Sequence, residues 1–564
     1  MKFLIPVLPL LWFSPVLAAP AKVKRAAPTA TILAPSATVV GKTSLDVDVF
    51  NAIPFAQPPI DSLRLKPPQP LERALGNFDA TGLPKACPQF FFSTDDSDWP
   101  SSVLADLTNN PLFQTITNAG EDCLTLDIRR PAGTTADDKL PVLVWIFGGA
   151  FELGGTAMYE ATPLVQSSVS LDMPIIHVAI NYRVGGFGFM PGKEILADGA
   201  GNLGLLDQRL ALKWVADNIA AFGGDPDKVT IWGESAGAIS VFDQMILYDG
   251  DNTYKNKPLF RGAIMNSGGI VPADPVDSAK GQAVYDAVVA DAGCSSATDT
   301  LECLRGLDYD VFLKAANSVP GVLSYHSVAL SYLPRPDGTA LTDSPDVLAK
   351  AGKYARVPFI NGNMEDEGTI FALFQSNITT TDEVADYLAS YFFHGATQEQ
   401  LKELVATYPD TTTDGSPFRT GIFNNWYPQF KRIAAILGDL TFTLTRRVLF
   451  QTVEDLTPDV PSWSYLASYN HLTPILGTFH GGDILQVFYG ILPNYASRSI
   501  QSYYFSFVYD LDPNSRRGSF MEWPQWGESH QLMQFFNDRG ALLDDDFRSD
   551  TYEFISKNVE SFHI

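Results

Sequence analysis

The middle of the chain alternates between short apolar runs and longer stretches with helical spacing. The apolar runs predict strands at 140–151, 173–183, 228–232, 261–269 and 355–363. The first two are apolar at successive positions, which is typical of strands buried on both faces of a parallel sheet. Helices are predicted at 205–226, 236–247 and 430–450. Strands that alternate with helices in this way predict an α/β fold with a doubly wound sheet.

The two ends of the chain differ from this middle. Residues 26–37 are small and include prolines, so we expect them to be loosely ordered, and 47–59 predicts short alternating strands before a proline loop. The part after about residue 380 is expected to be rich in helices. No linker, charge block or repeat of 20–50 residues divides the chain, so we expect one domain over 38–564.

The first twenty residues, MKFLIPVLPLLWFSPVLAAP, have the pattern of an export signal. Lys2 precedes an apolar run that closes with small residues, which predicts a signal peptide over 1–18, cleaved after Ala18. A second cleavage after Lys24-Arg25 is the alternative, which makes 19–37 a candidate pro-segment or flexible N-terminus. No later apolar run is long enough to span a membrane, so we expect a secreted, extracellular protein.

Composition and charge exclude several classes of protein. A chain of 564 residues with 45% hydrophobic residues can bury a large core, which excludes disorder for most of its length. The formal net charge of −25 repels nucleic acid and anionic lipid headgroups, so neither is expected as a partner. The charge identifies no substrate, and nothing in the sequence indicates an oligomeric state.

An exported chain with an even number of cysteines is expected to form disulfides. The four are Cys87, Cys123, Cys294 and Cys303. Their order permits three pairings, of which the nearest-neighbour one closes two separate loops. No pair has CxxC spacing and no histidine has metal-site spacing, so zinc is not expected. Asn377 begins an Asn-Ile-Thr acceptor and is a predicted glycosylation site.

The segment IWGESAGAIS (231–240) contains the first candidate catalytic residue. In it, Ser235 follows a predicted strand and precedes a predicted helix. A serine on so sharp a turn has its Oγ exposed above the sheet edge. Gly233 and Gly237 avoid collisions with the neighbouring helix and strand. The helix N-terminus offers N–H groups to a developing oxyanion. Ser235 is therefore predicted to be a nucleophile rather than a structural turn serine.

A serine nucleophile needs a base, and the base needs an orienting acid. Of the seven histidines, His480 stands out because GTFHGGDI (477–484) places it on a glycine-flanked loop late in the chain. His177 lies in an apolar strand and is expected to be a packing residue. The acid should follow a strand between the serine and the histidine. The segment 357–371 offers three acids that spacing does not separate: Glu365, Asp366 and Glu367.

Longer segments around these residues carry recognisable signatures. The clearest are FGGDPDKVTIWGESAG (222–237) and EDCL (121–124). Further blocks are RLKPPQP (64–70), NAIPFAQPP (51–59), NYRVGGFGF (181–189), NLGLLDQ (202–208) and WPQW (523–526). In these segments the chain resembles the type-B carboxylesterase/lipase family, the cholinesterase-like α/β-hydrolases, and especially secreted fungal lipases of the Candida rugosa type. The resemblance, from about residue 40 onward, implies an α/β-hydrolase fold with a large, mostly parallel central sheet, helices on both faces and a small N-terminal sheet.

The resemblance also implies residue roles. The family's acid is the glutamate of an EGT or EGS motif, which corresponds to Glu367, and its base corresponds to His480. The implied disulfides are Cys87–Cys123 and Cys294–Cys303. Backbone N–H groups that would form an oxyanion hole belong to Gly149, Ala150 and Ala236. The family usually has a third glycine where this chain has Ala150, so we expect a methyl group near the acyl oxygen and a changed pocket shape.

The chemistry implied is two-step acyl transfer from an ester, without a cofactor. The segment 88–122 mixes aromatic and polar residues. It is either a surface loop tied by a disulfide or an amphipathic lid that opens at an oil–water interface, as in the fungal lipases. We expect a lipase or long-chain carboxylesterase that acts on small-molecule or lipid esters and contacts a lipid interface transiently. A short-chain or sterol esterase is the alternative, and Ser235, Glu367 and His480 argue against a non-catalytic adhesion module.

Overall fold

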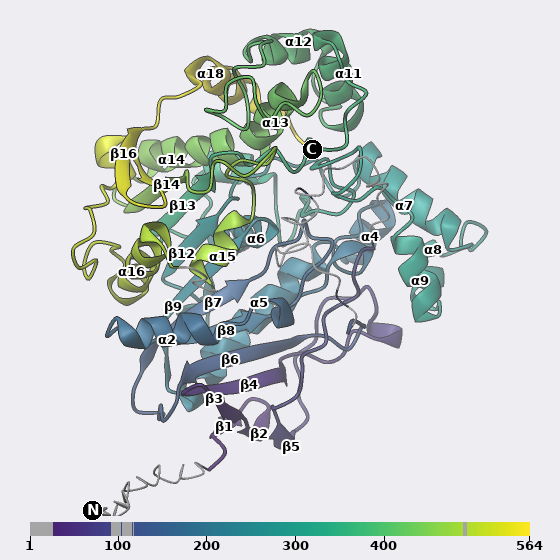
Figure 1. The fold of residues 1–564 in the computed structure, drawn as a ribbon. Coiled ribbons are helices and arrows are strands. Elements are labelled where there is room, and N and C mark those ends of the chain that lie inside the picture. The colour runs from purple at the N-terminus through teal and green to yellow at the C-terminus, as the bar shows by residue number, and fades with distance from the viewer. Residues whose placement is uncertain (1–25, 92–102, 104–115, 117, 489–492) are drawn as a thin grey trace, which may run out of the picture.

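The structure is a computed structural model that describes residues 26–91, 103, 116, 118–488 and 493–564. An 11-stranded sheet crosses the molecule, and a 3-stranded sheet lies beyond one end of it (Figure 1). A 2-stranded hairpin in the described part of the chain is not hydrogen-bonded to either sheet. The order of the large sheet is β16 (Gly540–Asp544), β15 (Gln531–Phe535), β14 (Ser462–Ala467), β13 (Phe359–Met364), β12 (Gly262–Asn266), β9 (Gly224–Glu234), β7 (Leu140–Ile146), β8 (Ile176–Ile180), β6 (Thr125–Pro131), β4 (Val47–Pro54) and β3 (Lys42–Ser44).

Neighbouring strands from β15 to β8 run parallel, and the pairs at the two edges run antiparallel. Strands β8, β12, β13 and β14 are buried at every position, as expected where helices cover both faces. The predicted, mostly parallel sheet is therefore confirmed. It includes five strands that we did not predict: β3, β6, β14, β15 and β16.

Two successive residues of β9 show that helices pack on opposite faces of the sheet. The ring of Trp232 lies 5.9 Å from that of Tyr504 in α16 (Tyr495–Asp510), whereas the next residue, Gly233, faces α6 (Ala236–Ile246). The other helices are α2 (Thr162–Ser170), α3 (Gly185–Gly188), α4 (Lys193–Asp198), α5 (Leu203–Asn218), α7 (Ala279–Asp291), α8 (Thr300–Arg305), α9 (Tyr309–Ala316), α10 (Pro345–Lys350), α11 (Thr381–Tyr391), α12 (Gln398–Ala406), α13 (Phe430–Gly438), α14 (Leu444–Leu456), α15 (Gly482–Val487), α17 (Trp526–Ser529) and α18 (Ser549–Asn558). Within the described ranges, no helix combines the length and hydropathy that a membrane crossing requires.

The helix predicted over 430–450 is interrupted. A π-helical segment, η6 (Asp439–Thr443), separates α13 from α14. The backbone of Gly368 lies against α13 so closely that a Cβ there would overlap the carbonyl oxygen of Ala434. The irregular turn therefore lies where the loop after β13 packs onto the helix, and π segments are frequent at functional sites.

The N-terminal segment 26–37 is more ordered than we expected. Strand β1 (Thr29–Leu33) pairs antiparallel with β2 (Ser36–Val40), and β2 pairs with β5 (Gly76–Asp79) in the small sheet. The reason is an alternation that the prediction overlooked, since Ala30 and Ile32 point inward and are buried. The predicted signal peptide over 1–18 and the cleavage after Arg25 lie outside the described residues.

The four cysteines form two disulfides. Cys87 is bonded to Cys123 and Cys294 to Cys303, which is the nearest-neighbour pairing. The first bond closes a loop of 36 residues and the second a loop of 9. The first bond therefore fixes the two ends of the segment 88–122 to the body of the protein.

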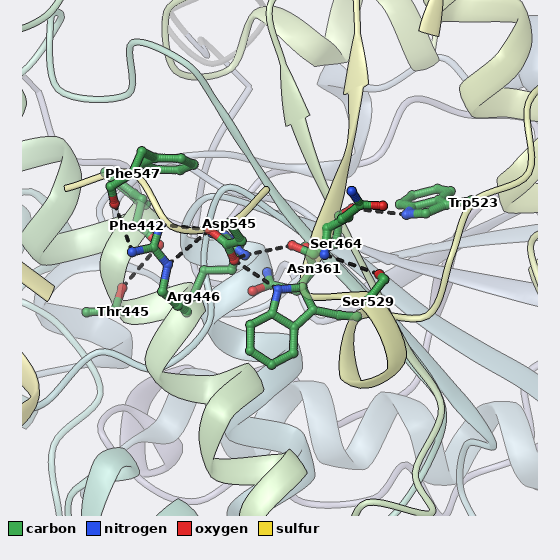
Figure 2. A network of polar contacts seen from close by, with 12 residues as sticks. Asn361, Phe442, Thr445, Arg446, Ser464, Trp523, Ser529, Asp545 and Phe547 are labelled. Carbon is green, nitrogen blue, oxygen red and sulfur yellow. Dashed lines mark hydrogen bonds and ion pairs between the residues drawn. The ribbon is translucent and has the colours of Figure 1, made fainter. Parts of the chain in front are cut away.

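A buried polar network anchors the C-terminal strands of the large sheet (Figure 2). Arg446 of α14 donates to both carboxylate oxygens of Asp545 at 2.7 Å and to Ser464 Oγ of β14 at 2.8 Å. Ser464 Oγ in turn donates to the Asn361 carbonyl of β13. Burial opposes the charge of Asp545, but Arg446 and Arg447 hold its pKa below the ordinary value. The network fixes β13 and β14, and the loops that carry the candidate acid and base follow these strands.

Candidate active site

Ser235 lies at the sharp turn between β9 and α6. Its backbone has φ 57° and ψ −127°, a positive φ that residues other than glycine rarely adopt. The Ser235 N–H donates to the Asn266 carbonyl at the end of β12, at 2.9 Å. The residue is 8% exposed and lines a cavity. Such strain at a strand–helix turn is typical of a nucleophile held above a sheet edge.

The two glycines beside Ser235 allow this turn. A Cβ on Gly233 would lie 2.3 Å from the backbone of Gly237, and a Cβ on Gly237 would lie 2.1 Å from the carbonyl oxygen of Ile146 in β7. Real Cβ atoms do not approach other atoms so closely, so larger residues would displace α6. The collisions expected from the sequence are therefore confirmed.

Ser235, His480 and Glu367 form one hydrogen-bonded line. His480 Nε2 lies 2.8 Å from Ser235 Oγ, and His480 Nδ1 lies 2.6 Å from Glu367 Oε2. An ionised carboxylate only accepts hydrogen bonds, so Nδ1–H donates to Glu367 and Nε2 is left to accept from the serine hydroxyl. The side chains of His480 and Glu367 are buried. A proton can pass from the hydroxyl to the imidazole in this geometry.

Two aromatic rings hold the imidazole in place. The ring centroids of Phe371 and Phe442 lie 5.1 Å and 4.6 Å from that of His480. Phe442 belongs to the π segment η6, and Phe371 follows the loop that carries Glu367. The packing restricts rotation of the imidazole about its bond to the chain.

The structure distinguishes the three adjacent acids, among which sequence spacing could not choose. Glu367 Oε2 contacts His480, and Glu367 Oε1 accepts the Met364 N–H at 2.8 Å. Asp366 accepts the Thr478 N–H at 2.8 Å, which ties down the histidine loop, and burial raises its pKa to about 7. Glu365, whose side chain is mostly buried, forms an ion pair with Arg419 instead. Of the three acids, only Glu367 therefore reaches the imidazole.

Three polar residues that the sequence analysis missed surround this relay. Glu234 Oε1 lies 3.5 Å from His480 Nε2, and burial, followed by the charges of Asp483 and Glu367, raises its pKa well above the ordinary value. Asn266 Nδ2 donates to Asp483 Oδ2 at 2.7 Å, and burial raises the pKa of Asp483 to about 6. In the sequence, only its position directly before Ser235 could have indicated Glu234. A protonated Glu234 adds no second negative charge beside the imidazole.

Gly149, Ala150 and Ala236 line the cavity together with Ser235 and His480. No acceptor within the described part of the chain receives their backbone N–H groups. Gly149 has φ 113° and Ala150 φ 57°, and a Cβ on Gly149 would lie 2.3 Å from the Leu153 carbonyl. Ala150 therefore occupies the left-handed region that favours glycine, at some cost in strain.

The cavity beside Ser235 is mostly apolar. It is partly open to solvent. Its walls include Leu153, Ile239, Val271, Val328, Leu333 and Phe371. A site of this character suits an apolar chain with one polar end at the relay.

The remaining predicted residues have simpler surroundings. His177 is buried in β8, where burial lowers its pKa to about 3, and it is the expected packing residue. Asn377 is exposed, and its Nδ2 donates to the Tyr325 hydroxyl at 3.1 Å. Most of the segment 88–122 lies outside the described residues. Among the residues that are described, no group of three or more His, Cys, Asp or Glu side chains could hold a metal ion.

Comparison with known proteins identifies relatives along almost the whole chain. The profile of the Carboxylesterase family matches residues 28–555. "Secreted lipase 1" of Botryotinia fuckeliana is 62% identical over 547 residues, which cover 97% of this chain and 95% of that protein. "Secreted triacylglycerol lipase LIP1" of Gibberella zeae is 60% identical and covers 96% of this chain and 92% of that protein. "Lipase 4" of Diutina rugosa is 46% identical, with 96% and 97% covered.

A solved structure has the same fold. The crystal structure of Aspergillus niger EstA is similar with a TM-score of 0.81 and 27% sequence identity. The similarity covers 96% of this chain and 99% of that one. The large sheet, its helices and the small N-terminal sheet thus belong to a known architecture.

Proposed function

The chain belongs to the carboxylesterase family, and from that premise we propose that it is a secreted lipase that hydrolyses long-chain acyl esters, including triacylglycerols. It is a carboxylic ester hydrolase. The single observation that carries the proposal is the line Ser235–His480–Glu367, which opens into a mostly apolar cavity. The relatives named as secreted lipases support the substrate class and the extracellular location.

In the proposed first step, Ser235 Oγ attacks the ester carbonyl while His480 Nε2 takes its proton. Glu367 keeps the proton of the other imidazole nitrogen in place and stabilises the imidazolium that forms. The N–H groups of Gly149, Ala150 and Ala236 would stabilise the tetrahedral oxyanion, each by about 3 kcal/mol. His480 then protonates the leaving alcohol.

In the second step, water attacks the acyl-enzyme. His480 takes a proton from that water, and the carbonyl of the ester bond to Ser235 is again polarised by the same N–H groups. The acid leaves and Ser235 recovers its proton. No group beyond these side chains and N–H donors has to take part in either step.

Other parts of the proposal rest on the sequence. The segment 88–122 acts as a lid that exposes the cavity at a lipid surface, and Asn377 carries a glycan. The N-terminal segment is removed on export. A short-chain or sterol esterase remains the second candidate within the same fold.

Hydrolysis of p-nitrophenyl esters from acetate to palmitate, with and without detergent, tests the substrate class. A lipase retains its kcat/KM at palmitate and gains activity in the presence of an interface. A sharp fall in kcat/KM beyond butyrate would leave a short-chain esterase instead.

A further inference from the structure

Asp243 lines the same cavity as Ser235 and takes no part in the relay. It lies on α6, where Ala236, Ile239 and Asp243 follow one another at intervals of three and four residues, and all three line the cavity. Residues with this spacing share one face of a helix. The carboxyl group of Asp243 is therefore on the cavity face of α6.

The carboxyl group has no partner within the described chain. Asp243 is 0% exposed, and neither Oδ1 nor Oδ2 makes a hydrogen bond to a described residue. Burial raises its pKa well above the ordinary value, so the group is protonated and can both donate and accept. A buried polar group without a partner costs free energy. A buried polar residue of this kind in a mostly apolar wall is expected to bind a partner from outside the chain.

We propose that Asp243 binds a hydroxyl group on the acyl chain of the substrate, and that this enzyme prefers esters of fatty acids hydroxylated near mid-chain. The inference rests on the proposed function, because it takes the cavity as the acyl site. A hydroxyl group is the simplest match for a neutral carboxyl group, since each can donate to and accept from the other.

The position of Asp243 indicates which carbon would carry the hydroxyl. Eight residues separate Ser235 from Asp243, which corresponds to about 12 Å along the helix axis at 1.5 Å per residue. An extended chain advances about 1.2 Å per bond, so the carboxyl group lies about ten carbons from an acyl carbonyl on Ser235. The zero exposure of Asp243 means that the cavity is closed to water there. An acyl chain therefore reaches the carboxyl group by displacing apolar side chains in between.

The test compares p-nitrophenyl esters of stearate, 10-hydroxystearate and 17-hydroxystearate on the whole protein. The wild type should favour 10-hydroxystearate over stearate by about tenfold or more in kcat/KM, because a buried polar group discriminates against a substrate that leaves it unpaired. The 17-hydroxyl lies beyond reach of Asp243 and should give no such preference.

Variants separate recognition from a structural role. Asp243→Leu should reduce the preference to about one or below and raise the melting temperature, because an unpartnered polar group is removed. Asp243→Asn, which keeps hydrogen-bonding atoms, should retain part of the preference. Val328→Leu, which alters the cavity wall without a polar group, should leave the ratio of the two rates as in the wild type.

Equal ratios in the wild type and Asp243→Leu would overturn the inference while stearate hydrolysis still supported the proposed function. A wild-type ratio near one would do the same. A folded wild type that hydrolyses none of the three esters would overturn the proposed function itself.

Discussion

The carboxylates of Asp366 and Glu367, neighbours in the chain, contact the same histidine loop at two different points. Glu367 Oε2 lies 2.6 Å from His480 Nδ1, whereas Asp366 Oδ2 accepts the Thr478 N–H at 2.8 Å. Asp366 Oδ1 also accepts the Phe418 N–H at 2.7 Å. One acid thus orients the imidazole, and the other fixes the backbone that carries it.

This division of roles predicts different defects for two adjacent substitutions. Glu367→Gln should lower kcat by about 10⁴ through loss of the correct imidazole tautomer, with little change in melting temperature. Asp366→Asn should lower the free energy of unfolding by about 1–3 kcal/mol, because an amide cannot accept all of these N–H donors. Both variants are assayed at pH 8, where Asp366 is ionised, since its pKa is raised to about 7. An equal loss of kcat in the two variants would contradict the assignment of Glu367.

The buried carboxyl group of Glu152 should make the stability of the protein depend on pH. Its Oε2 accepts the Val322 N–H at 2.9 Å, and burial raises its pKa from 4.5 to about 8. The folded protein keeps this proton up to about pH 8, whereas the unfolded chain releases it near pH 4.5. The contribution of Glu152 to the free energy of unfolding is therefore present in full below pH 4.5 and decreases as the pH rises to 8.

Glu152→Gln removes this titration and keeps an acceptor for the Val322 N–H. The melting temperature of the variant should rise relative to that of the wild type as the pH increases from 4.5 to 8. Thermal unfolding of both proteins across this range gives the difference directly. A difference that stays constant with pH would show that Glu152 does not titrate as the structure implies.

The two disulfides should differ in their effect on stability. The Cys87–Cys123 bond closes 36 residues and the Cys294–Cys303 bond closes 9. The longer loop restricts the unfolded chain more, so removal of the first bond should cost about 1 kcal/mol more than removal of the second. Paired alanine variants of each bond, compared by denaturant unfolding, test this order, and a larger loss for the short loop would reverse it.

Gly237 should not tolerate a methyl group. Its Cβ would lie 2.1 Å from the Ile146 carbonyl, so Gly237→Ala should lower the free energy of unfolding by about 3 kcal/mol or more and reduce activity. Gly527 in α17 is the matched control, because a Cβ there has no atom within 4 Å. Gly527→Ala should therefore leave melting temperature and activity nearly unchanged, and similar losses in both variants would contradict the close approach of α6 to β7.

The apolar runs along the chain predicted the central strands because those strands are buried on both faces. Strand β14 was missed because Ser-Trp-Ser-Tyr alternates polar with aromatic residues and lies in a region expected to be helical. The π segment Asp439–Thr443 was also missed. It begins where the loop at Gly368 packs against Gly438, a tertiary contact that the local sequence does not indicate.

The candidate site was predictable only in part. Flanking glycines distinguished Ser235 and His480, but spacing could not separate Glu367 from the acids beside it, since the direction in which each side chain leaves the loop depends on the fold. Asp243 gave no signal in an apolar helix. Its unusual setting appears only when the cavity and the missing partner are known.

The central claim is that Ser235 is the nucleophile, and the most direct measurement is peptide mapping after reaction with a fluorophosphonate probe. The probe should add to Ser235 in the active wild type and should label neither the folded Ser235→Ala variant nor another serine. Active protein that carries the probe on a different residue, or that hydrolyses esters without reacting at Ser235, would contradict the account.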